Sequence, residues 1–187
     1  VKGVVSGIFA ASGQSCQAGS RLLVQRSIQD RFVGMLVDFV RKAKLGDPTQ
    51  PDTQVGPIAT RPQFEKVLSY IELARREGAT AALGGRARPG LGAGMFVEPT
   101  ILTGVRNDMR IAQEEVFGPV LAVIPFDDED DAVRIGNDVA YGLAAGVWTK
   151  SLRRAMLLTE KLKAGTVWVN NYRATSFTAP FGGYKNS

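Results

Sequence analysis

The stretch Val120–Phe126 constrains the fold of this chain more than any other segment. Its residues are nearly all apolar, and a short apolar run between turn residues is typical of a strand buried on both faces. Such strands belong to parallel sheets whose two faces are covered by helices. The alternation of helical and strand patterns predicts an α/β fold with a largely parallel sheet flanked by helices. A first helix is predicted from residue 1 until Gly13 stops it, and further helices at 27–44, 61–77, 127–137 and 151–163. Further strands are predicted at 21–25, 80–83, 96–102, 146–149 and 166–169.

Short-range signals refine the ends of these elements. Ser27 and Asp30 resemble a capping box at the start of the second helix, and Thr60 is placed to cap the third. Pro99 has no backbone N–H, so the strand predicted around it is expected at the edge of the sheet. Residues 84–94 are rich in glycine and are expected to form a turn-rich loop. No linker interrupts the pattern, and the chain length suits one compact domain.

Composition excludes several classes of protein. The chain has one cysteine and no histidine, so it cannot supply the imidazole of Ser-His-Asp or Cys-His catalysis. No metal site is expected, because only carboxylates could join the single thiol as ligands. The lone cysteine indicates a reducing, cytoplasmic location. The net charge of +5 is spread along the chain, so neither nucleic-acid binding nor, without an apolar run of about 18 residues, a membrane span is expected.

Cys16 is the first candidate for chemistry. It lies among small and polar residues between a predicted helix and a predicted strand. A buried cysteine acting as a small apolar side chain is the alternative, but loops on rigid scaffolds are common places for functional sites. Attack on an electrophile requires the thiolate, and no adjacent cation in the sequence is placed to favour it.

Three further segments combine polar and aromatic residues next to predicted strands. Residues 113–119 contain Glu114 and Glu115 before an aromatic residue and a Gly-Pro turn. Adjacent carboxylates face different ways, so a hydroxyl-binding group or an ordinary turn is expected here, and not an acid–base pair. Residues 165–173 end a strand with two amides, an aromatic residue and an arginine, where ligands of parallel sheets gather. Residues 179–187 are either part of a site or a surface loop.

Four motifs in the same order resemble the NAD(P)-dependent aldehyde dehydrogenase superfamily over nearly the whole chain. Residues 13–21 (GQSCQAGSR) are similar to the family's nucleophile motif, and residues 114–119 (EEVFGP) to its second signature. Residues 165–170 (GTVWVN) and 180–185 (PFGGYK) are similar to its two late motifs. The order of the four makes a chance resemblance hard to accept.

The resemblance implies a reaction and a set of site residues. Cys16 attacks an aldehyde, hydride passes to NAD or NADP, and water hydrolyses the resulting thioester to the acid. Cofactor-binding positions matched by the resemblance are Glu115 at the nicotinamide-side ribose, Phe117 near the nicotinamide, and Gln63 and Lys66 near the adenine-side ribose. Positions matched to the substrate entrance are Asn170, Tyr172, Arg173, Thr175 and Phe181.

The sequence also departs from the family pattern. It contains neither the E-L-G-G-K segment with the general base, nor the oxyanion-hole amide, nor a dinucleotide-binding domain, nor the C-terminal assembly strand. Residues 1–187 are therefore expected to be an incomplete catalytic domain that is inactive alone, because a general base contributes typically ~10²–10⁴-fold. The full-length protein is expected to be a homo-oligomer. A CoA-acylating semialdehyde dehydrogenase and a non-catalytic structural or binding relative remain as alternatives.

Overall fold

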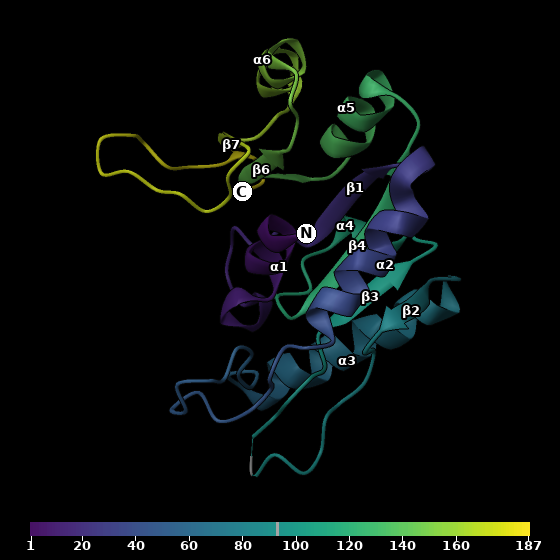
Figure 1. Cartoon of the computed structure of the whole chain (residues 1–187), viewed down its shortest axis with the longest axis vertical. Helices are drawn as coiled ribbons and strands as arrows, with labels where there is room; N and C mark the ends of the chain where they lie inside the picture. Colours follow the sequence, from purple (N-terminus) through teal and green to yellow (C-terminus); the bar gives the residue numbers. More distant parts are fainter. Residues whose placement is uncertain (93) are drawn as a thin grey trace. The chain divides into compact units, whose positions relative to one another are not determined.

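The computed structural model describes residues 1–92 and 94–187, and the chain forms two compact units. Unit 1 is Val1–Pro125 and unit 2 is Phe126–Ser187 (Figure 1). The fold is α/β, as the sequence predicts, but it divides where the pattern shows no linker. No helix of the described residues is long and apolar enough to cross a membrane.

Unit 1 is built on a four-stranded sheet with the order β1-β4-β3-β2. Its strands are β1 (Arg21–Gln25), β2 (Thr80–Leu83), β3 (Thr100–Thr103) and β4 (Val120–Phe126). β3 and β4 are parallel, whereas β2 pairs antiparallel with β3 and has an irregular register in its second half. β1, β2 and β4 have the predicted bounds.

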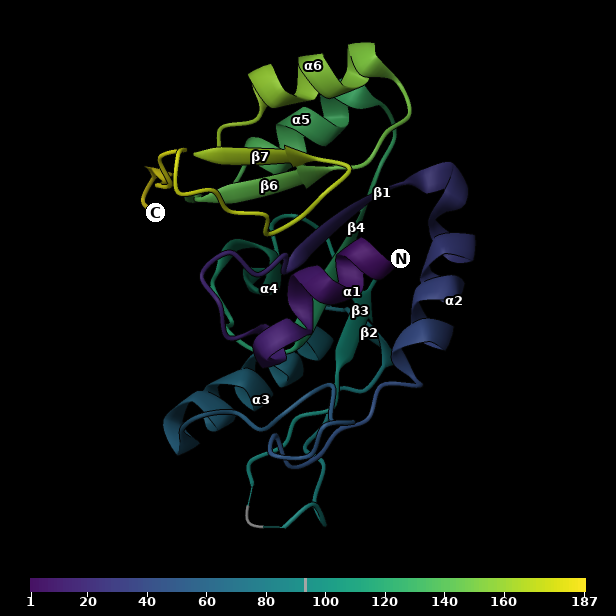
Figure 2. The same cartoon turned by 60° about the vertical axis from the view of Figure 1, so that its left-hand side comes forward.

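Helices cover both faces of this sheet (Figure 2). α1 (Lys2–Ile8) and α2 (Gln29–Val40) pack on one face, and α3 (Arg61–Arg76) lies on the other side. β4 is buried along most of its length, which confirms the prediction of a strand covered on both faces. The core shared by α1, α2 and the sheet contains Ile8, Phe9, Val24, Leu36, Val40, Val55, Ile101, Leu121 and Val123.

Two predictions about the second helix are wrong. Ser27 lies inside a short 3₁₀ turn (Arg26–Ile28), so Ile28 takes the N-cap position and no side chain caps α2. The helix ends at Val40 and does not reach Lys44. Instead, the Lys44 carbonyl accepts a hydrogen bond from the backbone N–H of Gln54 at 2.9 Å, so the backbone of Lys44 is part of a loop.

The prediction that residues 96–102 form an edge strand is also wrong. β3 begins after Pro99 and lies between β4 and β2. Thr100 makes the first bond of the strand, its N–H donating to the Pro119 carbonyl at 2.8 Å. A proline just before a strand costs no ladder bond, so it does not exclude a central position. The predicted loop 84–94 contains turns as expected, and its position 93 lies outside the described residues.

Unit 2 contains two small two-stranded sheets. β6 (Ala144–Val147) and β7 (Thr166–Val169) are parallel, whereas β5 (Tyr141–Gly142) and β8 (Tyr184–Lys185) are antiparallel. α5 (Glu129–Asn137) and α6 (Leu152–Lys161) lie along one side of the β6–β7 pair (Figure 2). The sequence shows no signal for β5 and β8. Lys185 holds them in place, since its Nζ donates to the carbonyls of Asn137, Val139 and Tyr141 at 2.7, 3.0 and 3.2 Å.

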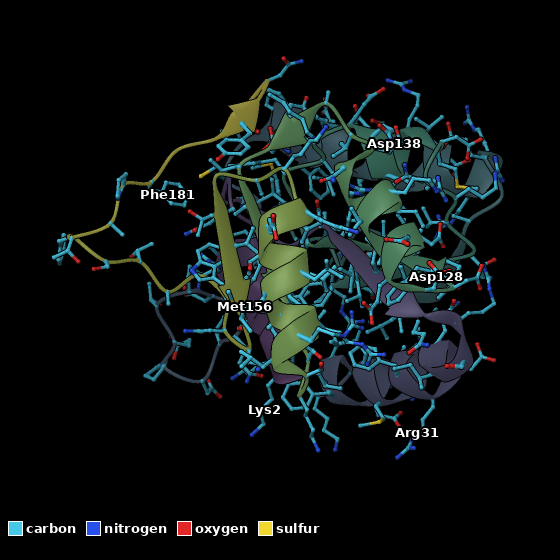
Figure 3. The ribbon with its side chains drawn as sticks, turned by 90° about the horizontal axis from the view of Figure 1, so that it is seen from above. Lys2, Arg31, Asp128, Asp138, Met156 and Phe181 are labelled. Atoms are coloured by element: carbon cyan, nitrogen blue, oxygen red, sulfur yellow. The ribbon has the colours of Figure 1, made fainter. Side chains whose placement is uncertain are left out.

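The N-terminus of α5 provides a stability prediction. The Asp128 carboxylate accepts a bond from the Asp131 N–H at 2.9 Å, and Asp128 lies at one end of the helix (Figure 3). Asp128→Ala removes this cap and is expected to lower the free energy of unfolding by about 1 kcal/mol, whereas Asp128→Asn keeps an acceptor and should cost much less. Urea unfolding of the two variants measures the difference. Equal losses in both would show that the hydrogen-bond acceptor kept by Asn contributes nothing.

Candidate active site

Cys16 lies exposed on the loop that joins a 3₁₀ turn (Ala10–Gly13) to β1. The far end of this loop is tied to α1, because the Gly19 N–H donates to the Gly7 carbonyl at 3.0 Å. The thiol is therefore accessible, and the alternative of a buried apolar cysteine is wrong. The backbone of the loop that carries this accessible thiol is held by its hydrogen bond to α1.

The near end of the cysteine loop is tied to a second loop of unit 1. The Gln14 side chain accepts from the Ala59 N–H at 2.9 Å and donates through Nε2 to the Pro57 carbonyl at 3.3 Å. The buried Ser12 hydroxyl donates to the Gly56 carbonyl at 2.9 Å. Paired bonds of this kind fix both the position and the direction of the backbone leading to the thiol.

Gly13 brings the cysteine loop against the loop at residues 114–119. Its φ is +71°, and a Cβ at this position would lie 2.0 Å from the Gly118 carbonyl oxygen. No side chain fits there, because the obstructing atoms belong to backbone. Gly13 thus allows two predicted motif segments, about a hundred residues apart in sequence, to touch.

Glu114 and Glu115 have different environments. Glu114 accepts from Arg110 Nε at 2.7 Å and Nη2 at 2.9 Å, and also from the Tyr70 hydroxyl. These bonds, that of Arg110 first and that of Tyr70 second, lower the pKa of Glu114 to about 2. Glu115 is exposed, and its carboxylate has no partner among residues 1–92 and 94–187. Only Glu115 is free to receive hydroxyl groups of a ligand.

Phe117 is held in an uncommon backbone conformation by Gln63. Its φ is +56°, and Gln63 Nε2 donates to the carbonyls of Val116 at 2.7 Å and Phe117 at 2.9 Å. A positive φ in a bulky residue is strained and persists where other contacts impose it. Lys66, one turn further along α3, places its Nζ 5.8 Å from the centre of the Tyr70 ring. Gln63 and Lys66 therefore both lie beside the loop that bears Glu115 and Phe117.

In unit 2, Asn170 and Tyr172 follow the end of β7. The Asn170 side chain bonds to Thr149 twice, its Oδ1 accepting from N–H and its Nδ2 donating to C=O, both at 2.9 Å. The Tyr172 ring meets Trp168 edge-on at 4.9 Å between centroids. It also lies over Gly146, where a Cβ would be 2.5 Å from the ring. Burial raises the pKa of Tyr172 to about 12.

The other predicted substrate residues lie on the loop after Tyr172. Arg173 has φ +64°, and its Nη1 is buried without a hydrogen-bond partner among the described residues. The Trp168 indole donates to the Ala174 carbonyl at 2.7 Å, which fixes the backbone between Arg173 and Thr175. Thr175 and Phe181 are exposed, Phe181 at 48%, and Figure 3 shows Phe181 on the open loop.

The structure thus brings the predicted residues together in two groups. Cys16, Gln63, Lys66, Glu115 and Phe117 belong to three adjoining segments of unit 1. Asn170, Tyr172 and Arg173 gather beyond the carboxyl end of the β6–β7 pair in unit 2. No group of three His, Cys, Asp or Glu residues within the described ranges could hold a metal ion.

Comparison with known proteins agrees with these motifs. A sequence model described as the aldehyde dehydrogenase family matches residues 1–187. The chain belongs to the aldehyde dehydrogenase family. It is similar to the betaine aldehyde dehydrogenase of Mesorhizobium japonicum, with 46% identity over 189 residues that cover 100% of this chain. The chain spans only 39% of the length of that relative.

Solved structures of aldehyde dehydrogenases share the fold. An indole-3-acetaldehyde dehydrogenase complexed with NAD+ matches with a TM-score of 0.95 and 49% identity, covering 98% of this chain and 37% of that one. The betaine aldehyde dehydrogenase of Staphylococcus aureus in complex with NAD+ matches with a TM-score of 0.96 and 44% identity over the same shares. Both structures carry NAD+, the cofactor class that the sequence resemblance implies.

Two residues that hold this aldehyde dehydrogenase site together lie outside the motifs predicted from the sequence. Tyr70 and Arg110 hold the loop at residues 114–119 through Glu114, whereas Gln14, which holds the cysteine loop, belongs to the predicted nucleophile motif. A weak signal existed for Arg110, which is four residues before Glu114, the spacing of helical ion pairs. No local signal links Tyr70 to Glu114, since the two are brought together by α3 packing beside the loop.

The lowered pKa of Glu114 makes its contribution to stability depend on pH. Because the folded-state pKa is about 2 and the ordinary value is 4.5, Glu114 stabilises the fold above pH 4.5 and loses this effect as the pH falls toward 2. Glu114→Gln is therefore expected to be less stable than wild type at pH 7, with a smaller difference at pH 3. Urea unfolding at the two pH values measures this. A difference that stays constant with pH would contradict the ion pair.

Proposed function

We propose that the full-length protein carrying this chain oxidises an aldehyde to a carboxylic acid with NAD+ or NADP+, using Cys16 as the nucleophile. The observation that carries the proposal is the exposed Cys16 thiol on a loop that begins just after Gly13, a residue that touches the loop bearing Glu115 and Phe117. A reaction between two bound molecules needs its nucleophile and its cofactor-binding groups on rigidly connected backbone. Family membership supports the same reaction.

In the proposed reaction, the Cys16 thiolate forms a C–S bond to the aldehyde carbon, and the carbonyl π electrons move to oxygen. The backbone N–H of Cys16 is an expected donor to the oxyanion of this thiohemiacetal. Bound NAD(P)+ supplies the acceptor for the hydride that leaves the carbon as the C=O bond re-forms and a thioester remains. Water then adds to the thioester carbon, a general base takes its proton, the C–S bond breaks, and the acid departs with the thiolate restored.

The residues of unit 1 fit a nicotinamide cofactor. The free carboxylate of Glu115 is suited to accept bonds from ribose hydroxyls, and the half-buried Phe117 ring to pack on a planar heterocycle. Lys66 adds a cation on the adjacent face of α3. The Nε2 amide group of Gln63 already donates to two loop carbonyls. Its acceptor atom, Oε1, is therefore the one proposed to bind the adenine-side ribose.

The residues of unit 2 are proposed to line the aldehyde entrance of the full-length protein. Tyr172 and Phe181 supply apolar surface, and Arg173 and Thr175 supply polar groups. Asn170 acts indirectly, because its side chain holds Thr149 with both of its polar atoms. These contacts predict that Asn170 substitutions disturb the backbone around Thr149, whereas Phe181 substitutions alter substrate preference.

A panel of aldehydes offered to the full-length protein with NAD+ or NADP+ tests the proposal. The panel includes betaine aldehyde and indole-3-acetaldehyde, which are named for relatives. Formation of NADH or NADPH with release of free acid supports the hydrolytic reaction. Reduction that requires coenzyme A assigns the CoA-acylating alternative. The absence of reduction with every aldehyde, with and without coenzyme A, overturns the proposal in favour of a non-catalytic relative.

Residues 1–187 expressed alone are proposed to be inactive. They contain Cys16 but no E-L-G-G-K segment for the general base, whose loss costs typically ~10²–10⁴-fold. We also propose that the full-length protein is a cytoplasmic homo-oligomer, on the basis of the family resemblance and the single cysteine. Steady turnover by the 187-residue polypeptide would overturn the first statement.

A further inference from the structure

One face of α3 holds the loop at residues 114–119 at three points. Gln63, Val67 and Tyr70 are spaced by four and three residues, so they share a face of the helix. Gln63 binds the loop carbonyls, the buried Val67 lies where a Cβ on Gly118 would come within 2.5 Å, and the Tyr70 hydroxyl donates to Glu114. The helix thus determines where this loop runs.

Arg110 also binds this loop, through the carboxylate of Glu114. Its guanidinium binds both oxygens of Glu114, at 2.7 and 2.9 Å, and lies 5.8 Å from the Tyr70 ring. Its backbone N–H donates to Glu77 at the end of α3 at 3.1 Å. α4 (Arg110–Gln113) is a single turn, too short to be stable without tertiary contacts. The Tyr70–Glu114–Arg110 contacts therefore fix the segment that leads into the loop.

The backbone conformation of Glu114 determines the direction of the Glu115 side chain. Glu114 is extended, with φ −114° and ψ 151°, and successive side chains of extended backbone point to opposite sides. With the Glu114 carboxylate bound to Tyr70 and Arg110, the next side chain is directed away from them. Glu115 is accordingly exposed and has no partner in the described part of the chain.

We infer that Tyr70 and Arg110 are positioning residues that act through Glu114 to orient Glu115 for the cofactor ribose. The inference rests on the proposed function. Neither residue touches the reacting atoms in this scheme, so their loss is expected to weaken cofactor binding while the chemical step at saturating cofactor stays nearly unchanged. Cys16 reactivity toward an alkylating agent without cofactor is expected to be unaffected.

Cofactor titration of the full-length protein tests the inference. Tyr70→Phe keeps the ring and removes only the hydroxyl donor, and it is expected to raise the Kd for NADH or NADPH roughly 3- to 10-fold, because one hydrogen bond to a charged group is lost. Arg110→Gln is expected to raise it by a similar or larger factor, and Arg110→Lys by less. At saturating cofactor, kcat is expected to stay within about twofold of wild type.

A matched control comes from the same helix. Arg76→Gln breaks an exposed ion pair with Glu72, 3.2 Å long and one turn apart, that does not contact the loop. It is expected to leave the cofactor Kd unchanged. Thermal unfolding of every variant shows whether the fold persists. Because Tyr70→Phe is conservative, it keeps the test open if the arginine variants fail to fold.

The double variant Tyr70→Phe with Glu115→Gln shows whether Tyr70 affects cofactor binding by positioning Glu115 or independently of Glu115. If Tyr70 acts through Glu115, Tyr70→Phe adds little to the Kd of Glu115→Gln alone, because the two effects share one interaction. Fully additive effects, or wild-type affinity in Tyr70→Phe, overturn the inference while leaving the proposed function intact. A wild-type protein that binds neither NADH nor NADPH overturns both.

Discussion

Cys16→Ala in the full-length protein is expected to lower aldehyde-dependent cofactor reduction by at least about 10³-fold, because the variant has no atom that can form the covalent intermediate. Cofactor reduction is followed at saturating aldehyde and cofactor. The exposed position of Cys16 allows the substitution without opening a cavity, so the fold should be unaffected. The loss therefore reports on chemistry and not on stability.

Two observations control this experiment. Cofactor titration should give the same Kd for Cys16→Ala and wild type, since the residues proposed to bind the cofactor are other ones. Cys16→Ser keeps a nucleophilic atom of much higher pKa and should remain strongly impaired, because a thiolate is the effective nucleophile. A Cys16→Ala variant that retains more than a tenth of wild-type activity would remove Cys16 from the mechanism.

Gly13→Ala is expected to be the most damaging single-methyl change in unit 1. The new Cβ would lie 2.0 Å from the Gly118 oxygen and 2.4 Å from its carbonyl carbon, at a residue with φ +71°. Both obstructing atoms are backbone, so the cysteine loop and the loop at residues 114–119 must separate. The left-handed conformation and overpacking together suggest a loss of about 2–5 kcal/mol in the free energy of unfolding.

Two glycines of the same unit serve as controls for Gly13→Ala. Gly34 lies inside α2 with open space around it, so Gly34→Ala should raise the free energy of unfolding by about 0.5–1 kcal/mol. Gly78 has φ +104° and open space, so Gly78→Ala isolates the backbone cost from the steric one. Urea unfolding ranks the three. A Gly13→Ala variant as stable as Gly78→Ala would show that the two loops do not touch.

Local patterns in the sequence predict most of the secondary structure. The apolar run Val120–Phe126, the strands predicted at 21–25, 80–83 and 166–169, and the Thr60 cap depend on neighbouring residues, and each agrees with the structure. The strand predicted at 146–149 is found two residues earlier, at Ala144–Val147. The errors lie where distant residues decide the outcome. Lys44, predicted to lie in the second helix, is outside α2 and bonds to Gln54 in a loop. The strand after Pro99 is central because β2 and β4 pair on either side of it.

The sequence alone also determines the family, because residue type and order suffice to recognise a motif, and the same motif singles out Cys16 as the proposed nucleophile. Only the tertiary structure decides what the matched residues do. Of two adjacent carboxylates, that of Glu114 accepts hydrogen bonds from Arg110 and Tyr70, while that of Glu115 is exposed and available to a ligand. Gln63 holds the backbone of Phe117. The physical reason is that a side chain's function depends on which partners satisfy its hydrogen bonds, and those partners come from segments that only folding brings together.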